Sequence, residues 1–209
     1  MIPHRTPFFL PWMFPSLYWR IESASNELFL TFDDGPVPGP TEFVLEELSR
    51  NGIKATFFCI GNNVAGHPDI FSKIIEGGHA LGNHTYHHRS GWKTSTEQYE
   101  RDVLACQREF RKHLSPDVVL FRPPYGRITP KQIKSLSRFR IIMWDVLSVD
   151  YNRRLSPERC LQNTIQAVRS GSIIVFHDSY KAERNMTFAL PRFIEHCLEN
   201  NYTFKPIVL

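Results

Sequence analysis

Three features that mark other classes of protein are missing from this sequence of 209 residues. No apolar run approaches the roughly 20 residues that a membrane-spanning helix needs. No two cysteines have the C-x-x-C spacing of a thiolate metal site or a redox motif. No charge of one sign dominates, because 25 Lys and Arg against 21 Asp and Glu leave a net charge of only +4. We therefore expect neither a membrane-spanning protein nor a nucleic-acid partner.

The composition is that of a folded globular domain, with 42% hydrophobic and 22% charged residues. Its 9 histidines and 13% aromatic residues stand out, and they direct attention to metal chemistry and to a stacking surface. The cysteines are far apart and lie among apolar residues, which favours buried free thiols and a reducing compartment. They are Cys59, Cys106, Cys160 and Cys197.

Residues 1–20 are rich in aromatic side chains and carry a proline at every fourth position. The prolines interrupt any helical core of a signal peptide, and no small-residue cleavage site follows. We therefore expect no cleavable signal peptide and a cytoplasmic location. We interpret residues 1–26 as an N-terminal strap that packs on the domain and covers one end of it. The alternative is a peripheral contact with the inner face of the membrane, made by the aromatic residues with Arg5 and Arg20.

Short β-branched and aromatic runs alternate with helical patterns in the rest of the chain, giving about seven β/α units. This alternation predicts a parallel sheet covered by helices, either curled toward a barrel or open and doubly wound. In both folds, ligands bind beyond the carboxyl ends of the strands. The expected strands are residues 28–32, 55–60, 80–83, 118–121, 140–146, 172–176 and 203–208. The expected helices are residues 41–50, 68–76, 96–113, 129–137, 157–168 and 187–199.

Two adjacent carboxylates, Asp33 and Asp34, follow the first expected strand and are followed at once by Gly-Pro. Like charges this close repel unless a cation or a proton is present, which indicates one metal-bound and one proton-handling carboxylate. The alternative is a plain turn in which the aspartates hydrogen-bond their own backbone.

Three histidines within five residues follow the third expected strand. If this stretch begins a helical turn, His84 and His88 share one face and can bind one ion, with His87 as the rival. Asp34 and two imidazoles would leave coordination positions open, as in catalytic metal sites. Each histidine taken alone has a structural interpretation as well.

Later strand ends carry further polar residues. Arg122 precedes two prolines in a stiff turn, which leaves its guanidinium free for a carboxylate and the amides near Tyr125 free for a ligand. Asp145 and Asp150 follow the fifth strand, and His177 ends the sixth. In isolation, each of these also has an explanation in capping or core packing.

Together these stretches resemble the motifs of the polysaccharide deacetylase (NodB-homology) family of carbohydrate esterases, metal-dependent enzymes that remove acetyl groups from sugar polymers. The resemblance spans residues 27–209 and implies that this part is the catalytic domain, with a distorted (β/α) barrel of about seven parallel strands. The matching stretches, each with the family pattern, are residues 31–36 (Thr-Phe-Asp-Asp-Gly-Pro), 84–88 (His-Ser/Thr-x-x-His), 122–126 (Arg-x-Pro-x-Gly), 150–151 (Asp-Trp) and 175–177 (Leu-x-His).

The resemblance implies a role for each matching residue. Asp34, His84 and His88 would bind a divalent metal, with zinc as the first choice and cobalt, manganese or nickel as alternatives. Asp33 would be the general base, and Arg122 would orient it.

The general acid would be His177, with its imidazole held by Asp150, although Asp145 competes for that place. Two positions depart from the family pattern: Tyr replaces Trp at 151 and Val replaces Leu at 175. The pocket for the acetyl methyl group is therefore expected to have a changed shape. The residues implied to contact the substrate are Tyr125, Pro124, Tyr151 and Val175.

The expected function is a metal-dependent hydrolase that removes acetyl groups from an N-acetylated glycan, such as peptidoglycan or a chitin-like oligosaccharide containing GlcNAc. An O-acetyl esterase acting on xylan-like sugars is one alternative, and a catalytically silent glycan-binding relative is the other. Every catalytic position of the family pattern is filled, which favours an enzyme.

A cytoplasmic glycan enzyme would meet its substrate as a lipid-linked precursor at the membrane, with the aromatic N-terminus as the contact. We expect part of the full-length chain to be recovered with membranes, and removal of residues 1–20 to lower that fraction. Cell fractionation measures this directly, and a full-length chain found wholly in the soluble fraction would contradict it.

Overall fold

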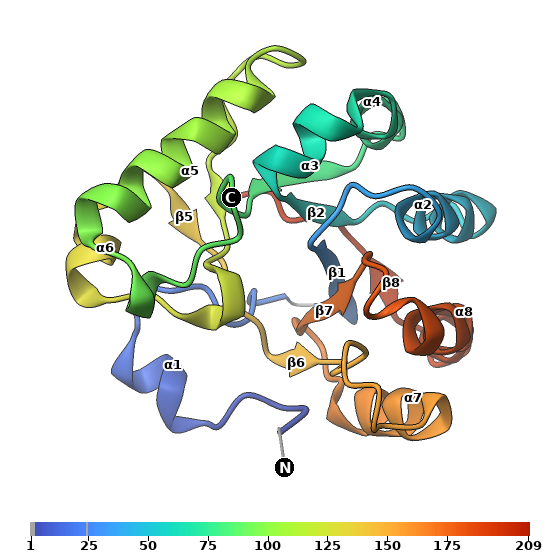
Figure 1. Cartoon of the computed structure of the whole chain (residues 1–209). Coiled ribbons are helices and arrows are strands. Elements are labelled where there is room, and N and C mark those ends of the chain that lie inside the picture. The colour runs from blue at the N-terminus through green and yellow to red at the C-terminus, as the bar shows by residue number, and fades with distance from the viewer. Residues whose placement is uncertain (1–2, 24) are drawn as a thin grey trace.

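The computed structural model describes residues 3–23 and 25–209. Its strands are β1 (Glu27–Asp33), β2 (Thr56–Cys59), β3 (Ala80–Asn83), β4 (Leu120–Phe121), β5 (Arg140–Ile141), β6 (Val146–Leu147), β7 (Ile173–His177) and β8 (Thr203–Phe204). They pair in parallel in the order β5-β4-β3-β2-β1-β7-β6, with β8 added beside β1. Figure 1 shows the strands in a curled arc with helices outside it. The predicted distorted (β/α) barrel is confirmed.

The helices cover the outer face of the curled sheet (Figure 1). Helix α3 has no counterpart among the expected helices, and α8 begins at Glu183 rather than at 187. The helices are α1 (Phe9–Met13), α2 (Pro40–Arg50), α3 (Gly61–Gly66), α4 (Pro68–Glu76), α5 (Thr96–Phe110), α6 (Pro130–Ser135), α7 (Pro157–Ala167) and α8 (Glu183–Glu199). Two short 3-10 helices are η1 (Gly91–Lys93) and η2 (Pro124–Gly126).

The central strands are buried on both faces, which is why they are continuous apolar runs. The rings of Phe32 and Phe57, on the neighbouring strands β1 and β2, stack with their centroids 5.1 Å apart. Helix α4 buries Ile70, Phe71 and Ile74, the spacing of an amphipathic helix, and Phe71 and Ile74 belong to the same core as these rings. The strand ends that carry the polar residues therefore rest on a rigid base.

Residues 140–146, expected as one strand, form two short strands with a break between them. Within the break, other parts of the chain bind the backbone. Arg122 donates to the carbonyls of Ile142 and Met143, at 3.2 and 2.9 Å, and Thr6 donates to the two carbonyls that follow. These four carbonyls accept hydrogen bonds from Arg122 and Thr6, so they do not pair with a neighbouring strand, and the β-ladder is interrupted at this point.

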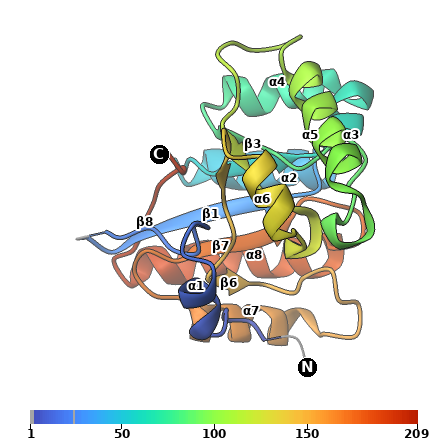
Figure 2. The ribbon, with the colours of Figure 1, turned by 90° about the vertical axis from the view of Figure 1, so that its left-hand side faces the viewer.

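The N-terminal strap pairs with both edges of the sheet. Tyr18 bridges to Ile142 beside β5, and Arg5 bridges to Val146 in β6. Helix α1 thus lies between α6 and α7 around the barrel, in the position seen in Figures 1 and 2. The strap packs on the domain, but it closes the open side of the half-barrel and does not cover an end. Sheet edges expose unpaired backbone groups, which explains why a segment is needed there.

The strap has one face in the core and one in solvent. Leu17 and Trp19 are buried, whereas Phe8 and Trp12 are 91% and 83% exposed. The predicted membrane contact stays a prediction, and Phe8 and Trp12 are the side chains available for it. Across the described residues, no helix has the length and apolar character to span a bilayer.

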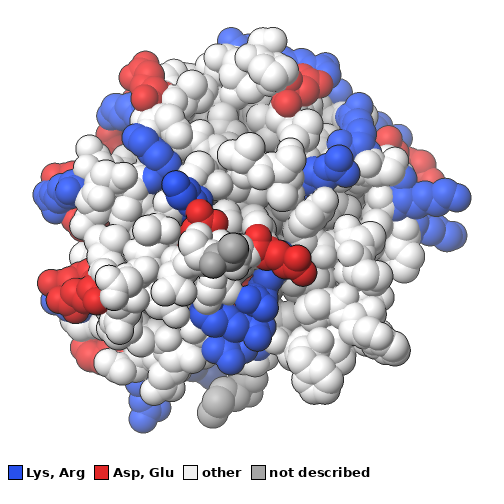
Figure 3. Space-filling view, turned by 180° about the vertical axis from the view of Figure 1, so that it is seen from behind, with Lys and Arg blue, Asp and Glu red and all other residues white. Residues whose placement is uncertain are grey.

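Charged side chains of both signs are mixed over the surface. On the face turned away in Figure 1, Lys and Arg lie beside Asp and Glu (Figure 3). Exposed pairs in contact include Lys73 with Glu42 at 2.7 Å and Arg111 with Asp117 at 2.5 Å. Exposed pairs of this kind contribute only about 0.2–1 kcal/mol each, so the fold depends on its core.

We expect Trp19→Ala to destabilise the chain by about 3 kcal/mol, because it removes a buried indole from the cluster that joins strap and sheet. The matched control is Trp12→Ala, whose effect should stay within about 0.5 kcal/mol because its ring is exposed. Urea unfolding of the two variants measures the difference. Equal losses of stability would show that the strap does not pack as described.

Candidate active site

The carboxyl ends of five strands meet in one cavity of about 540 Å³. Asp33 ends β1 and lies opposite His177, the last residue of β7, in the strand register. Asp34 follows directly, and the loop after β3 supplies His84 and His88 to the same cavity. The strand-end residues selected from the sequence are thus brought together, as a parallel sheet requires.

Arg122 binds Asp33 in a buried ion pair. Its Nη1 lies 2.6 Å from Asp33 Oδ1 and 2.7 Å from Thr31 Oγ1. The guanidinium is fully buried and lies over the ring of Phe58, 4.0 Å from the centroid. Its other donors go to the carbonyls of the break after β5. This fork fixes the direction of the Asp33 carboxylate and compensates its charge.

Asp34, His84 and His88 form a compact cluster. One ligand atom from each lies within 4.8 Å of the other two. Asp34 Oδ1 is 3.2 Å from His88 Nε2 and 3.6 Å from His84 Nε2. His84 Nδ1 lies 2.8 Å from the carbonyl of Arg122, so it donates there, and Nε2 keeps its lone pair toward Asp34. One carboxylate and two imidazoles suit a catalytic divalent metal.

The stretch from His84 to His88 is not helical, so the helical-turn premise is wrong although the two rings still converge. Thr85 and His88 have positive φ angles of 64° and 54°. The backbone amides of the loop are bound by side chains instead of by a helical ladder: Asn83 accepts from Thr85, and Asp102 accepts from the next two amides.

His87 belongs to a different contact. Its Nδ1 is 2.6 Å from Asp102 Oδ1, and its side chain is 54% exposed. The ring is thereby held away from Asp34, which leaves His88 as the second imidazole of the cluster. Asp102 is a residue that the sequence interpretation missed. Its signal was a carboxylate on the helix face that also carries Tyr99 and Val103.

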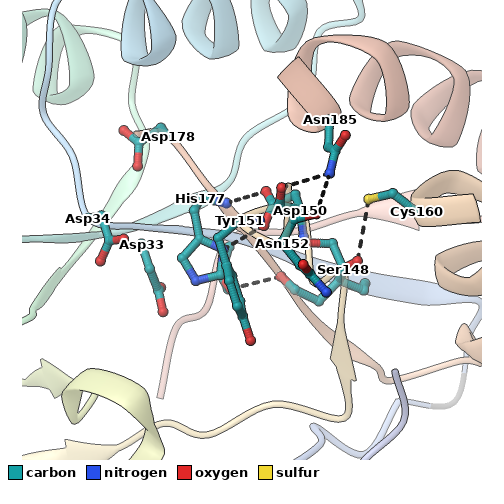
Figure 4. Close-up of polar contacts among 12 residues, drawn as sticks. Asp33, Asp34, Ser148, Asp150, Tyr151, Asn152, Cys160, His177, Asp178 and Asn185 are labelled. Atoms are coloured by element: carbon teal, nitrogen blue, oxygen red, sulfur yellow. Dashed lines mark hydrogen bonds and ion pairs between the residues drawn. The ribbon is translucent and has the colours of Figure 1, made fainter. Parts of the chain in front are cut away.

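His177 is paired with Asp150 (Figure 4). Nδ1 lies 2.7 Å from Asp150 Oδ1, and the backbone amide of His177 donates to Oδ2 at 2.8 Å. The competing Asp145 is bound elsewhere, by Arg169 at 2.8 and 3.0 Å and by Ser172 at 2.7 Å. The open choice between the two acids is settled in favour of Asp150.

The two buried histidines of the cavity have opposite charge preferences. Burial lowers the pKa of His84 to about 4, so its imidazole is neutral at pH 7. Burial also disfavours charge on His177, but the carboxylate of Asp150, together with Asp34 and Asp33, outweighs it and raises the pKa to about 9. His177 therefore carries its proton at pH 7 and loses it only as the pH rises through about 9.

Asp34 is held as a carboxylate. Burial alone would raise its pKa, but the hydrogen bond to His88 and the nearby His177 and His84 hold the pKa well below its usual range. The backbone of Asp34 has φ 82°, a conformation that Asp tolerates better than most residues, and Asn63 donates to its carbonyl at 2.7 Å.

The implied substrate contacts divide into three groups. Tyr125 has φ 61° and is 61% exposed, and its ring lies 4.6 Å from that of His88. Tyr151 and Val175 line the cavity wall, and the Tyr151 ring meets that of His177 edge-on at 5.0 Å. Pro124 is buried under the turn and does not line the cavity. The structure thus brings three of these four residues to the site.

Asp178 is a second residue that the sequence interpretation did not single out. It is fully buried, accepts a hydrogen bond from the Gly35 amide at 3.0 Å and one from Thr41 at 2.7 Å. Burial raises its pKa to about 8 despite the Thr41 bond. A side chain at Gly35 would clash with this carboxyl, so glycine is required there. Asp178 thereby fixes the loop that carries Asp34.

The family model described as "Polysaccharide deacetylase" matches residues 21–143, more than half of the chain. The chain belongs to the polysaccharide deacetylase family. Its curled fold is also that of a solved member. The crystal structure of the Bc1960 peptidoglycan N-acetylglucosamine deacetylase, in complex with 4-naphthalen-1-yl-N-oxidanyl-benzamide, superposes with a TM-score of 0.89 at 28% identity, over 97% of this chain and 95% of that one.

Two curated proteins are similar to this chain in sequence. A peptidoglycan-N-acetylglucosamine deacetylase of Bacillus cereus is 33% identical over 155 residues, which are 73% of this chain and 56% of that protein. This chain thus spans little more than half of that relative. A chitooligosaccharide deacetylase of Bradyrhizobium sp. is 31% identical over 175 residues, 81% of this chain and 80% of that protein.

We expect the charge of Asp150 to set the pKa of His177. In the metal-free chain, NMR titration of the His177 ring should give a midpoint near pH 9. Asp150→Asn removes the main stabilising charge and should move the midpoint to lower pH by about one to three units. Tyr151→Phe is the control, because it keeps the ion pair and should leave the midpoint in place. An unshifted midpoint in Asp150→Asn would show that another group protonates His177.

Proposed function

We propose that this member of the polysaccharide deacetylase family is a metal-dependent hydrolase that removes acetyl groups from an N-acetylated, GlcNAc-containing glycan. The observation that carries the proposal is that three groups of side chains lie in one cavity. They are the cluster of Asp34 with two imidazoles, Asp33 bound by an arginine, and the protonated His177. Amide hydrolysis needs all three, because it requires an activated carbonyl, a base for water and an acid for the amine.

A divalent metal fits the cluster of Asp34, His84 and His88. The donor atoms converge, the carboxylate is charged, and the neutral His84 presents a lone pair. Imidazole and carboxylate ligands suit zinc best, and cobalt, manganese and nickel accept the same set. When bound, such an ion polarises the acetyl carbonyl and lowers the pKa of a water molecule.

Asp33 is proposed to take the proton of the attacking water. Its carboxylate is 4% exposed and has one oxygen bound to Arg122, so the other oxygen is available and its direction is fixed. The backbone amide at Tyr125, in the strained turn after β4, is proposed to stabilise the oxyanion. His177 then donates its proton to the leaving amine, and the charge of Asp150 keeps that proton in place until the amine forms.

The substrate proposal rests on the relatives. Two similar proteins are named for peptidoglycan N-acetylglucosamine and one for chitooligosaccharide. Both glycans contain N-acetylated glucosamine units. A GlcNAc unit is therefore the substrate group proposed for this chain.

The test is acetate release from chitooligosaccharide, peptidoglycan and acetylated xylan, with and without a chelator. We expect release from the GlcNAc-containing substrates that stops with chelator and returns with zinc. Asp33→Asn should keep the metal and lose at least about 100-fold in turnover, the scale of one acid–base group. Release from xylan alone would support the esterase, and no release with metal bound would support a silent binding protein.

Metal content separates the ligand histidines from their neighbour. His84→Ala and His88→Ala should abolish metal retention in a purified chain, because each removes one of three donors. His87→Ala is the matched control and should retain the metal, since its ring binds Asp102. Loss of metal in His87→Ala but not in His88→Ala would reverse this assignment.

A further inference from the structure

A second cavity opens beside the active site. It is a groove of about 350 Å³ between the N-terminal strap and the turn before α6, and we call it the strap groove. The strap contributes Pro7, Leu10 and Phe14 to one wall, and Ile128 and Ile133 form the other. Its volume is that of a small-molecule site.

The strap groove and the active-site cavity adjoin each other. Tyr125, Trp144 and Leu147 line both of them. Trp144 can occupy this junction because Gly126, with φ 63°, has no side chain: a Cβ there would lie 2.6 Å from the indole. The same three side chains therefore bound both the space for a sugar beside Asp33 and the space for a group attached to that sugar.

The strap groove is predominantly apolar. None of its lining residues, all within the described part of the chain, carries a charge. Its polar side-chain atoms include several that are already bound within the protein: Thr6 donates to the Trp144 carbonyl at 2.6 Å and Trp92 to the Ile128 carbonyl at 3.3 Å. Sugar hydroxyls need free donors and acceptors, whereas an alkyl chain needs only a surface that removes it from water.

The strap groove is also preformed. The amide of Thr6 donates to the Asp145 carbonyl, and the amide of Leu147 donates to the His4 carbonyl, each at 2.8 Å. These bonds tie the strap to β6, and Leu17 and Trp19 anchor it in the core. An occupant therefore meets a wall that is already in place and does not have to order it.

We propose that the strap groove binds an apolar chain joined to the acetylated sugar, so that the substrate is an amphiphilic, lipid-type glycoside and not a free glycan. This inference rests on the proposed function, because it places the sugar end of the molecule in the active-site cavity. The wall of Tyr125, Trp144 and Leu147 that the two cavities share favours this occupant over an unrelated hydrophobic ligand.

The probes are β-glycosides of GlcNAc with methyl, butyl and octyl aglycones, used below their micellar concentrations with the full chain. We expect kcat/KM for acetate release to rise at least about tenfold from methyl to octyl, since each fully buried methylene is worth up to roughly fourfold. Leu10→Asn and Ile133→Asn should each lower the octyl-to-methyl ratio several-fold and leave the methyl glycoside unchanged. Trp12→Asn, on the exposed face of α1, is the control and should leave the ratio as it is.

Binding is measured separately, by calorimetry with the Asp33→Asn variant, so that it does not depend on turnover. The octyl glycoside should bind at least about tenfold more tightly than the methyl glycoside. Acetate release that ignores chain length, with equal binding, would overturn the groove proposal and leave the deacetylase intact. Absence of acetate release from every glycoside would count against the proposed function instead.

An octyl preference that survives both groove substitutions would also overturn the proposal, provided that urea midpoints show the variants to be folded. A preference for longer sugars would overturn the proposal as well. In that case added GlcNAc units would raise kcat/KM, the octyl aglycone would not, and Ile133→Asn would remove the gain from the added sugars, which would make the groove a sugar subsite. Leu10→Asn and Ile133→Asn act from opposite walls, so one of them remains informative if the other does not fold.

Discussion

The ion pair between the buried guanidinium of Arg122 and the carboxylate of Asp33 is the interaction on which the rest of the site depends. The guanidinium has no exposure to solvent. Its positive charge is compensated by the carboxylate of Asp33, to which it donates a hydrogen bond. It donates hydrogen bonds to Thr31 and Asp33 of β1 and packs on the ring of Phe58 in β2. It also donates to two backbone carbonyls in the break after β5. The carbonyl of Arg122 itself accepts from His84, so the same residue also sets which nitrogen of that imidazole faces Asp34. Removing one partner of such a buried pair costs about 3–5 kcal/mol, which couples the stability of the barrel to the orientation of the Asp33 carboxylate.

The fold and most of the site could be predicted from the sequence because strand-end position carries the information. Asp33, Asp34, Arg122 and His177 each follow an apolar run, and parallel strands deliver their ends to one edge. Two features could not be predicted in this way. The non-helical loop that brings His84 and His88 together depends on Asp102, which binds two backbone amides of the loop from 15 and 16 residues further along the chain, while Asn83 binds the Thr85 amide locally. The choice of Asp150 over Asp145 depends on Arg169 and Ser172 occupying the latter, and no local pattern shows that contact.

The N-terminal strap solves a problem that the sheet creates. A half-barrel of this kind ends in two short strands, β5 and β6, whose outer backbone groups have no neighbouring strand. The strap pairs with both edges and also supplies the apolar wall of the strap groove. Its sequence indicated that it would pack on the domain, but the proline and aromatic content did not reveal which surface it would meet. The edge it covers is defined only once the order of the strands is known.

The chemistry of the cavity follows from placing similar side chains in different surroundings. His84 and His177 are both imidazoles that are deeply buried, and burial alone would make both neutral. His84 faces a carbonyl acceptor on one side and is left neutral, with a pKa of about 4, whereas Asp150 holds charge on His177 and raises its pKa to about 9. At the same pH, one histidine is therefore suited to bind a metal ion and the other to donate a proton. The difference arises from the partner of Nδ1 in each ring, the Arg122 carbonyl or Asp150, and neither of these residues lines the cavity.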